Sequence, residues 1–114
     1  MNEDRIDKSS EDIFIRNGHL LQRLRLSDII WIRSEGNYCT FVTKDKKYAL
    51  KISLIRVLDV LPSDAFIQIH RSCAVRVDQI TAIDVHTNQV FINTASLPIG
   101  RKFKEALISR INLI

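Results

Sequence analysis

The strongest constraint on the fold is a succession of short extended segments joined by tight turns. These segments, rich in apolar and β-branched residues, lie at 13–16, 20–26, 29–33, 38–43, 47–52, 66–69, 80–85, 90–93 and 97–99. Asn17-Gly18 separates the first two, and this dipeptide is typical of a two-residue β-hairpin turn. Pro98 cannot donate to a sheet ladder, which places the last segment at an edge. The pattern predicts a mainly antiparallel β fold.

Two stretches have helical spacing instead. Ser53 is suited to capping a helix, apolar residues recur every three or four positions up to Leu61, and Pro62 then ends the pattern. A second helix is predicted over residues 101–111, with its apolar residues on one side. The aromatic residues predicted to lie in the core are Trp31, Phe66, Phe91 and Phe103.

The chain has the length and composition of one globular domain. It has 114 residues, of which 46% are hydrophobic and 26% are charged, so a packed core is expected. Residues 1–12 are polar and lack periodicity, which predicts a linker or disordered N-terminal edge before a domain at 13–114. The polar, acidic N-terminus and the absence of a long apolar run favour a cytoplasmic protein without a membrane partner.

The charge distribution favours an anionic partner. Residues 1–28 carry five basic and six acidic side chains, whereas residues 29–114 carry twelve basic and seven acidic ones. The basic excess therefore belongs to the body of the domain, which favours nucleic acid. Lys44, Lys46 and Lys47 have a plainer interpretation, in which they only solvate a hairpin turn.

No motif for catalysis or metal binding is present in the sequence. It lacks the glycine-rich phosphate loops, the hydrolase nucleophile elbow and the zinc-protease motif. Cys39 and Cys73 are far apart, have no ligand spacing, and are expected to be buried and reduced. We therefore expect no enzyme, no cofactor and no metal.

The most distinctive polar break interrupts an apolar stretch at Ile69-His70-Arg71-Ser72. A break of this kind places His70 and Arg71 at a strand end or in a loop, where side chains project outward. Arginine can pair bidentately with guanine, and histidine can donate to phosphate or base acceptors. Alternatively, His70 only stabilises a turn through its ring and Arg71 forms an ordinary surface ion pair.

Several pieces in register resemble a known family. They are Asp28-Ile29-Ile30-Trp31-Ile32, Gly36-Asn37-Tyr38, Ser53-Leu54, Phe66, Ile69-His70-Arg71-Ser72, Val75, Ile80 and Leu97-Pro98-Ile99-Gly100-Arg101. Together they resemble the LytTR family, the DNA-binding output domains of LytR/AlgR-type response regulators. The resemblance covers about residues 13–112. It implies an elongated set of small antiparallel β-sheets with two short helices, whose loops enter successive major grooves of double-stranded DNA.

The resemblance also assigns residues to the DNA contact. The implied base readers lie on three loops and are Asn37, Tyr38, Arg71 and Arg101. The implied phosphate-contacting or supporting residues are His70, Ser72, Arg76, Lys102 and Lys104. Tyr38 has an alternative interpretation as a half-buried hairpin aromatic. Cys73, Arg76 and Gly100 depart from the family's frequent residues, which leaves open the base preference and whether Arg76 adds a phosphate contact.

The resulting hypothesis is a sequence-specific DNA-binding transcriptional regulator, or its isolated output domain. In the full protein it would act with an upstream receiver domain or a sensor kinase partner, and as a dimer on DNA. Two rivals remain: a protein-interaction module that binds an acidic partner, and a single-strand or RNA-binding β domain. The second rival requires a cluster of exposed aromatic residues for stacking.

Overall fold

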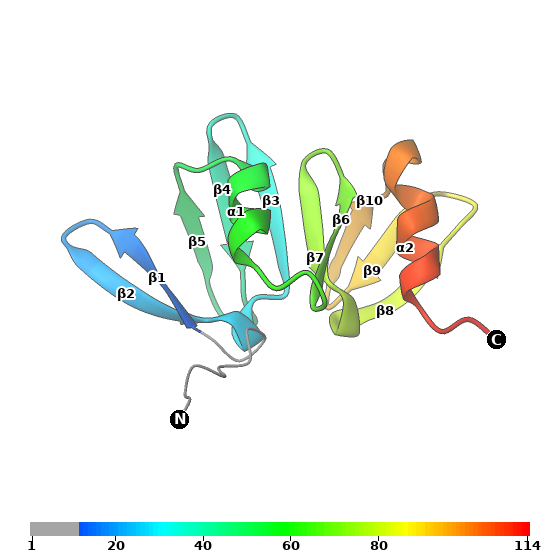
Figure 1. The fold of residues 1–114 in the computed structure, drawn as a ribbon, viewed down its shortest axis with the longest axis horizontal. Coiled ribbons are helices and arrows are strands. Elements are labelled where there is room, and N and C mark those ends of the chain that lie inside the picture. Colours follow the sequence, from blue (N-terminus) through cyan, green and yellow to red (C-terminus); the bar gives the residue numbers. More distant parts are fainter. Residues whose placement is uncertain (1–11) are drawn as a thin grey trace, which may run out of the picture.

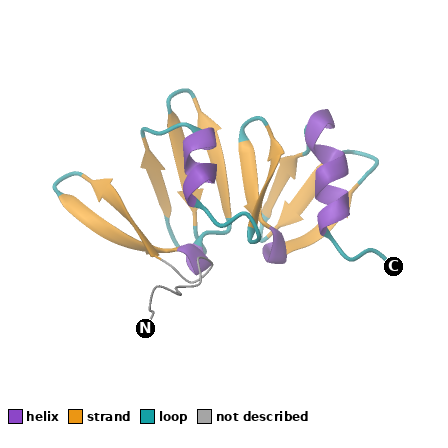
Figure 2. Ribbon diagram, viewed as in Figure 1, coloured by secondary structure: helices purple, strands orange, loops and turns teal. Residues whose placement is uncertain are grey.

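The computed structural model describes residues 12–114, and its elements are shown in Figures 1 and 2. The strands are β1 (Asp12–Asn17), β2 (Leu20–Arg25), β3 (Trp31–Glu35), β4 (Tyr38–Val42), β5 (Lys47–Leu50), β6 (Phe66–His70), β7 (Cys73–Arg76), β8 (Ile80–Asp84), β9 (Gln89–Ile92) and β10 (Ala95–Pro98). The helices are α1 (Leu54–Val60) and α2 (Lys104–Arg110), with short 3-10 turns η2 (Leu26–Asp28), η3 (Val77–Gln79) and η4 (Arg101–Phe103). The predicted N-terminal linker lies outside the described residues, except that Asp12 begins β1.

The strands form three antiparallel sheets. β1 pairs with β2, the order β5-β4-β3-β7-β6 makes the central sheet, and β10-β9-β8 makes the third. The predicted mainly antiparallel β fold with two short helices is confirmed, and β10 is an edge strand as Pro98 requires. Strand β7 was missing from the predicted segments, because all four of its residues are buried and it has no alternation of apolar and polar residues.

The central sheet is covered on both faces by different parts of the chain. On one face, Ile32 and Ala74 lie in a core cluster with residues of α1 and the β1–β2 hairpin. On the other face, Trp31 and Val75 pack in a second cluster with residues of β9, β10 and α2. Neighbouring residues of one strand therefore serve opposite cores, as the period of two in a strand dictates.

The local signals for the helices act as predicted, but one core assignment is wrong. The Ser53 hydroxyl accepts a hydrogen bond from the backbone N–H of Arg56 at 3.3 Å and so caps α1. Phe66 is buried and Trp31 and Phe103 are partly buried, whereas Phe91 is 37% exposed on the outer face of the third sheet. Alternation along β9 explains the error, because Val90 and Ile92 take the two inward positions.

Both cysteines are free and buried, as expected. Cys39 belongs to the first core cluster and Cys73 to the second, so the central sheet separates them. Burial raises the pKa of both thiols above the ordinary value. Within residues 12–114, neither helix has the length and apolar character needed to cross a membrane.

Candidate nucleic-acid interface

Antiparallel pairing brings four connections to one edge of the molecule. The β3–β4 turn (36–37) lies there. Because β7 begins opposite Arg33, two residues before the end of β3, the β6–β7 turn (71–72) lies beside it. The β5–α1 connection (51–53) returns to the same edge, and so does the segment 99–103 before α2 (Figure 1). We call this the basic edge.

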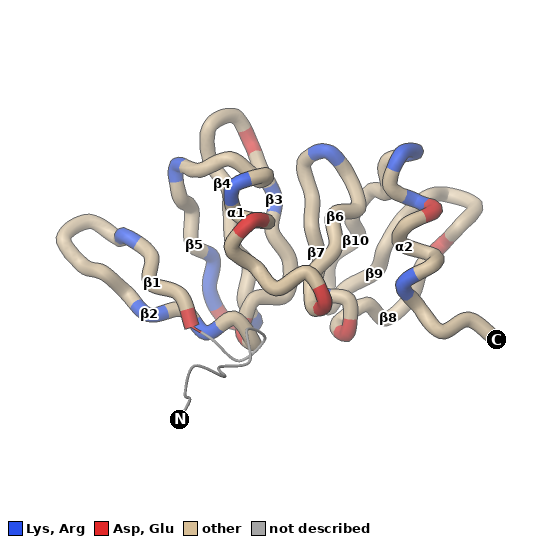
Figure 3. Tube along the Cα trace, in the orientation of Figure 1, with Lys and Arg blue, Asp and Glu red and all other residues tan. Residues whose placement is uncertain are grey.

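Charge distinguishes the basic edge from the opposite one. Its four connections carry four basic and no acidic side chains, which are Lys51, Arg71, Arg101 and Lys102. The five connections at the opposite edge carry four aspartates and two lysines, which are Asp28, Asp45, Asp64, Asp78, Lys44 and Lys46. In Figure 3 the β6–β7 turn and the segment before α2 are blue, and the α1–β6 and β7–β8 connections carry red. A polyanion is therefore attracted to one edge rather than to the whole domain.

Asn37 and Tyr38 lie at the tip of the β3–β4 hairpin. Glu35 pairs with Tyr38, so Gly36-Asn37 forms a two-residue turn, and Gly36 has a φ of +58° that suits glycine at its first position. Asn37 is exposed and Tyr38 is 50% exposed. Both side chains are accessible to a ligand, and Tyr38 is also the half-buried aromatic of the alternative interpretation.

Arg71 occupies the β6–β7 turn, and its neighbours hold the turn in shape. The backbone N–H of Ser72 donates to Nδ1 of His70 at 3.2 Å, and the Ser72 hydroxyl lies 3.0 Å from the same nitrogen. Because a backbone amide can only donate, Nδ1 accepts this hydrogen bond, which leaves Nε2 as the ring nitrogen that can donate. Arg71 itself is exposed and has no ion pair with another described residue. His70 thus stabilises the turn, and Arg71 is left available.

The segment that carries Arg101 and Lys102 is attached directly to the end of β6. The N–H of Gly100 donates to the carbonyl of Ile69 at 2.7 Å, and the N–H of Phe103 donates to the carbonyl of Gly100 at 3.0 Å. A Cβ at position 100 would lie 3.0 Å from the Phe103 ring and 3.5 Å from the His70 Cα. Glycine in place of a larger residue therefore permits this close approach.

The β3–β4 hairpin is attached to the same turn by another hydrogen bond. The N–H of Ser34 donates to the carbonyl of Ser72 at 2.8 Å. Together with the bond between Gly100 and Ile69, it connects the three segments that carry the predicted base readers. Asn37, Arg71 and Arg101 are thereby presented from one framework of strands.

Arg76 is the buried residue among those assigned a phosphate-contacting or supporting role. It is only 7% exposed, its Nε donates to the carbonyl of Ile29 at 2.9 Å, and Nη2 donates to the carbonyl of Leu26. Its guanidinium also stacks over the Phe66 ring, 4.6 Å from the centroid. These contacts leave Arg76 no access to a phosphate, so it can only support the fold.

Lys104 also has an intramolecular partner. Its Nζ donates to the carbonyl of Val85 at 2.7 Å and so connects α2 to the β8–β9 turn. Lys102, by contrast, is exposed and has no hydrogen bond to another described residue. Of the two lysines, Lys102 is the one free to contact a ligand.

Lys51 of the basic edge and Arg56 in the first turn of α1 were not among the predicted site residues. Lys51 and Arg56 line an open hollow of about 510 Å³ together with Gly36, Asn37, Ile52 and Ser53. The only signal at 51–56 in the sequence is the helix cap, and nothing in a linear pattern shows that this cap lies next to the β3–β4 turn. No group of three or more His, Cys, Asp or Glu side chains among the described residues is arranged to hold a metal ion.

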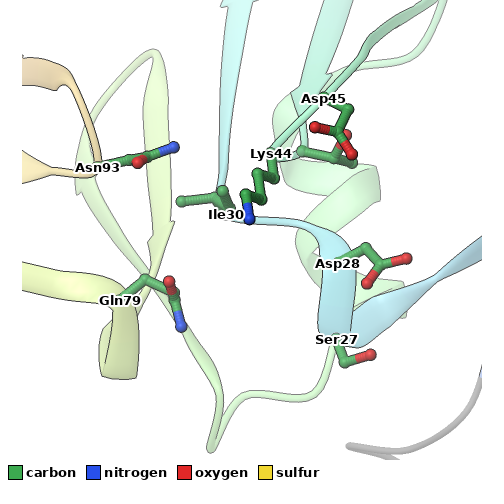
Figure 4. A pocket seen from close by; sticks show the side chains of 8 residues that line it. Ser27, Asp28, Ile30, Lys44, Asp45, Gln79 and Asn93 are labelled. Atoms are coloured by element: carbon green, nitrogen blue, oxygen red, sulfur yellow. The ribbon is translucent and has the colours of Figure 1, made fainter.

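A second hollow of about 510 Å³ lies at the opposite edge (Figure 4). Its lining is mixed in charge and comprises Ser27, Asp28, Ile30, Thr43, Lys44, Asp45, Gln79 and Asn93. Lys44 lies between Asp45 and Asp28 in this view. The aspartates make this hollow a poor site for a polyanion.

Comparison with known proteins gives matches of three kinds. Residues 21–112 match the LytTr DNA-binding domain family. The chain is 28% identical over 94 residues to "Sensory transduction protein LytR" of Streptococcus mutans, which covers 79% of the chain and 38% of that relative. A solved structure, the LytTr DNA-binding domain of a methyl-accepting/DNA response regulator described as putative, from Bacillus cereus, superposes with a TM-score of 0.75 at 19% identity, covering 87% of this chain and 94% of that one.

Proposed function

Because the chain belongs to the LytTR family of DNA-binding domains, we propose that its basic edge is the surface that reads a specific sequence in double-stranded DNA. One observation carries this proposal. The hydrogen bonds from Gly100 to Ile69 and from Ser34 to Ser72 hold three exposed polar tips on one edge that has no acidic connection residue. Loops mounted on packed strands can enter neighbouring grooves without large rearrangement.

Each proposed base reader has a side chain suited to an edge of a base. Arg71 and Arg101 can pair bidentately with O6 and N7 of guanine, and Asn37 can pair with N6 and N7 of adenine. Tyr38 offers a hydroxyl and an apolar ring that can lie against a thymine methyl group. Lys102 contacts a phosphate, while His70 and Ser72 keep the Arg71 turn in place.

The domain is proposed to act within a longer regulator. The chain spans about two fifths of the length of the curated relative it matches. An upstream receiver domain, or a sensor kinase partner, would then control whether a dimer assembles on direct repeats in DNA. A protein that regulates transcription in this way would work in the cytoplasm.

Selection from a randomised duplex pool tests the proposal. We expect a short enriched sequence, bound at least a thousand-fold more tightly than random duplex. Tighter binding to single strands would instead favour the RNA or single-strand rival. Steep salt dependence without enrichment would leave only a nonspecific polyanion binder, and an absence of any nucleic-acid binding would favour the acidic protein partner.

A further inference from the structure

We propose that Lys51 and Arg56 form a DNA phosphate-binding site beside the β3–β4 turn, and this inference rests on the proposed function of the basic edge. The two residues approach the turn from a separate part of the chain, the connection between β5 and α1 and the first turn of α1. Both side chains are exposed. They line one hollow of about 510 Å³ with Gly36 and Asn37.

The lining of this hollow suits an anion. It contains two cations, the Asn37 side chain and no acidic residue. Glu35, the acidic residue of the same hairpin, is not part of the lining. Neither the Lys51 ammonium nor the Arg56 guanidinium forms an ion pair with another described residue, so both charges are available for a ligand. At the opposite edge, one hollow has one cation and two aspartates, and a neighbouring one has three lysines with Asp45 in its lining.

The position of the hollow favours a backbone contact over a base contact. Asn37 lies at the tip of the β3–β4 hairpin, whereas Lys51 and Arg56 come from the β5–α1 connection and α1. These elements are neighbours in Figure 1. If the tip enters a major groove, the cations beside it meet the sugar–phosphate strand that borders the groove. The Ser53 hydroxyl is already used to cap α1, so the charged side chains are the ligands.

Contacts of this kind have a measurable signature. Each neutralised phosphate releases a counterion and adds about −0.9 to the slope of log K against log salt. At 1 M salt this electrostatic contribution vanishes, and at 0.15 M salt one such contact raises the affinity by about five-fold. Loss of the contact removes this gain on any DNA sequence. A base contact would instead change the preference between sequences.

The experiment measures fluorescence anisotropy of the chain with a selected duplex and a random duplex, across salt from about 0.05 to 0.4 M. The variants are Lys51→Gln, Arg56→Gln, their double variant, the charge-retaining Arg56→Lys, and Lys44→Gln as the control at the opposite edge. The exposed positions of all three residues predict unchanged thermal unfolding, which is measured alongside.

We expect Lys51→Gln and Arg56→Gln each to flatten the slope of log K against log salt by about 0.9 on both duplexes, and the double variant to flatten it by about 1.8. Arg56→Lys and Lys44→Gln should leave the slope unchanged. An unchanged slope in the double variant would overturn the site. If the variants lose the preference for the selected duplex while the salt slope stays unchanged, these residues are base readers. If Lys44→Gln flattens the slope equally, the effect is not specific to this hollow, and the site is overturned. If the wild type selects no sequence, the proposed function fails, while the slope on random duplex still decides this inference.

Discussion

The N–H of Gly100 donates to the carbonyl of Ile69 across 2.7 Å, and this hydrogen bond fixes where the C-terminal helical segment begins. It places Arg101 one residue after a point anchored to β6, and Arg71 one residue beyond the end of the same strand. Two arginines that are thirty positions apart in the sequence thus take their positions from one strand end. Substitutions at this junction should affect recognition more than they affect folding.

A methyl group at the junction tests this relationship. Gly100→Ala places a Cβ 3.0 Å from the Phe103 ring, and we expect a loss of about 1 kcal/mol in unfolding free energy as the ring shifts. Binding to the selected duplex should weaken, with random duplex almost unaffected. Adding Phe103→Leu, which removes the obstructing ring edge, should restore part of the preference. Equal weakening on both duplexes would show that the junction does not orient Arg101.

The two arginines are expected to read different base pairs. Arg71→Ala and Arg101→Ala should each cost about 1–3 kcal/mol on the selected duplex and relax the preference at separate positions. Repeating the duplex selection with each variant measures this. Lys44→Ala serves as a control, because Lys44 is exposed in the β4–β5 connection at the opposite edge. Relaxation at the same position in both variants would contradict separate contacts.

Arg76 should contribute to the stability of the fold and not to the electrostatic part of DNA binding. Arg76→Met removes the side-chain hydrogen bonds to the carbonyls of Leu26 and Ile29, and we expect a loss of about 2–4 kcal/mol in chemical unfolding. The variant that remains folded should keep the wild-type salt slope in DNA binding. A slope lower by about 0.9, with stability unchanged, would instead make Arg76 a phosphate contact.

Asp84 links stability to acid pH. The backbone N–H and side chain of Thr87, followed by the N–H of His86, hold the pKa of this carboxyl below its ordinary value. A depressed folded pKa contributes stability above the unfolded pKa, and this contribution is lost as pH falls through the folded pKa. We expect Asp84→Asn to lose that part of the acid dependence in thermal unfolding. An unchanged pH profile would show that the turn does not need the charge.

Much of the fold could be predicted because its signals are local. The Ser53 cap acts on its own neighbours and occurs where it was predicted. The first hairpin also forms, but Asn17 pairs with Leu20, so its two-residue turn is Gly18-His19 and not the predicted Asn17-Gly18. Strand β7 escaped prediction because burial on both faces removes the alternation that identifies a strand. Phe91 was placed in the core because its hydrophobicity is visible in the sequence, whereas its face of the sheet depends on pairing.

Some residues of the candidate site could likewise be predicted from local sequence, and others could not. The polar turn at Arg71 is visible as an interruption of an apolar stretch. Arg76 looks equally available in the sequence, but its carbonyl partners are 47 and 50 positions away. Lys51 and Arg56 carry no signal of their own, because their significance comes from lying beside a turn formed by other strands.

The unequal charge of the two edges also has a kinetic consequence. The connections along one edge are basic, and those along the other carry mostly aspartates. The domain therefore has an electric dipole moment across its width. In the field of a duplex, such a moment would rotate the domain during diffusion, so that the loops proposed to read bases face the DNA before first contact. Fewer collisions are then wasted on the wrong orientation, and the association rate should fall steeply with added salt.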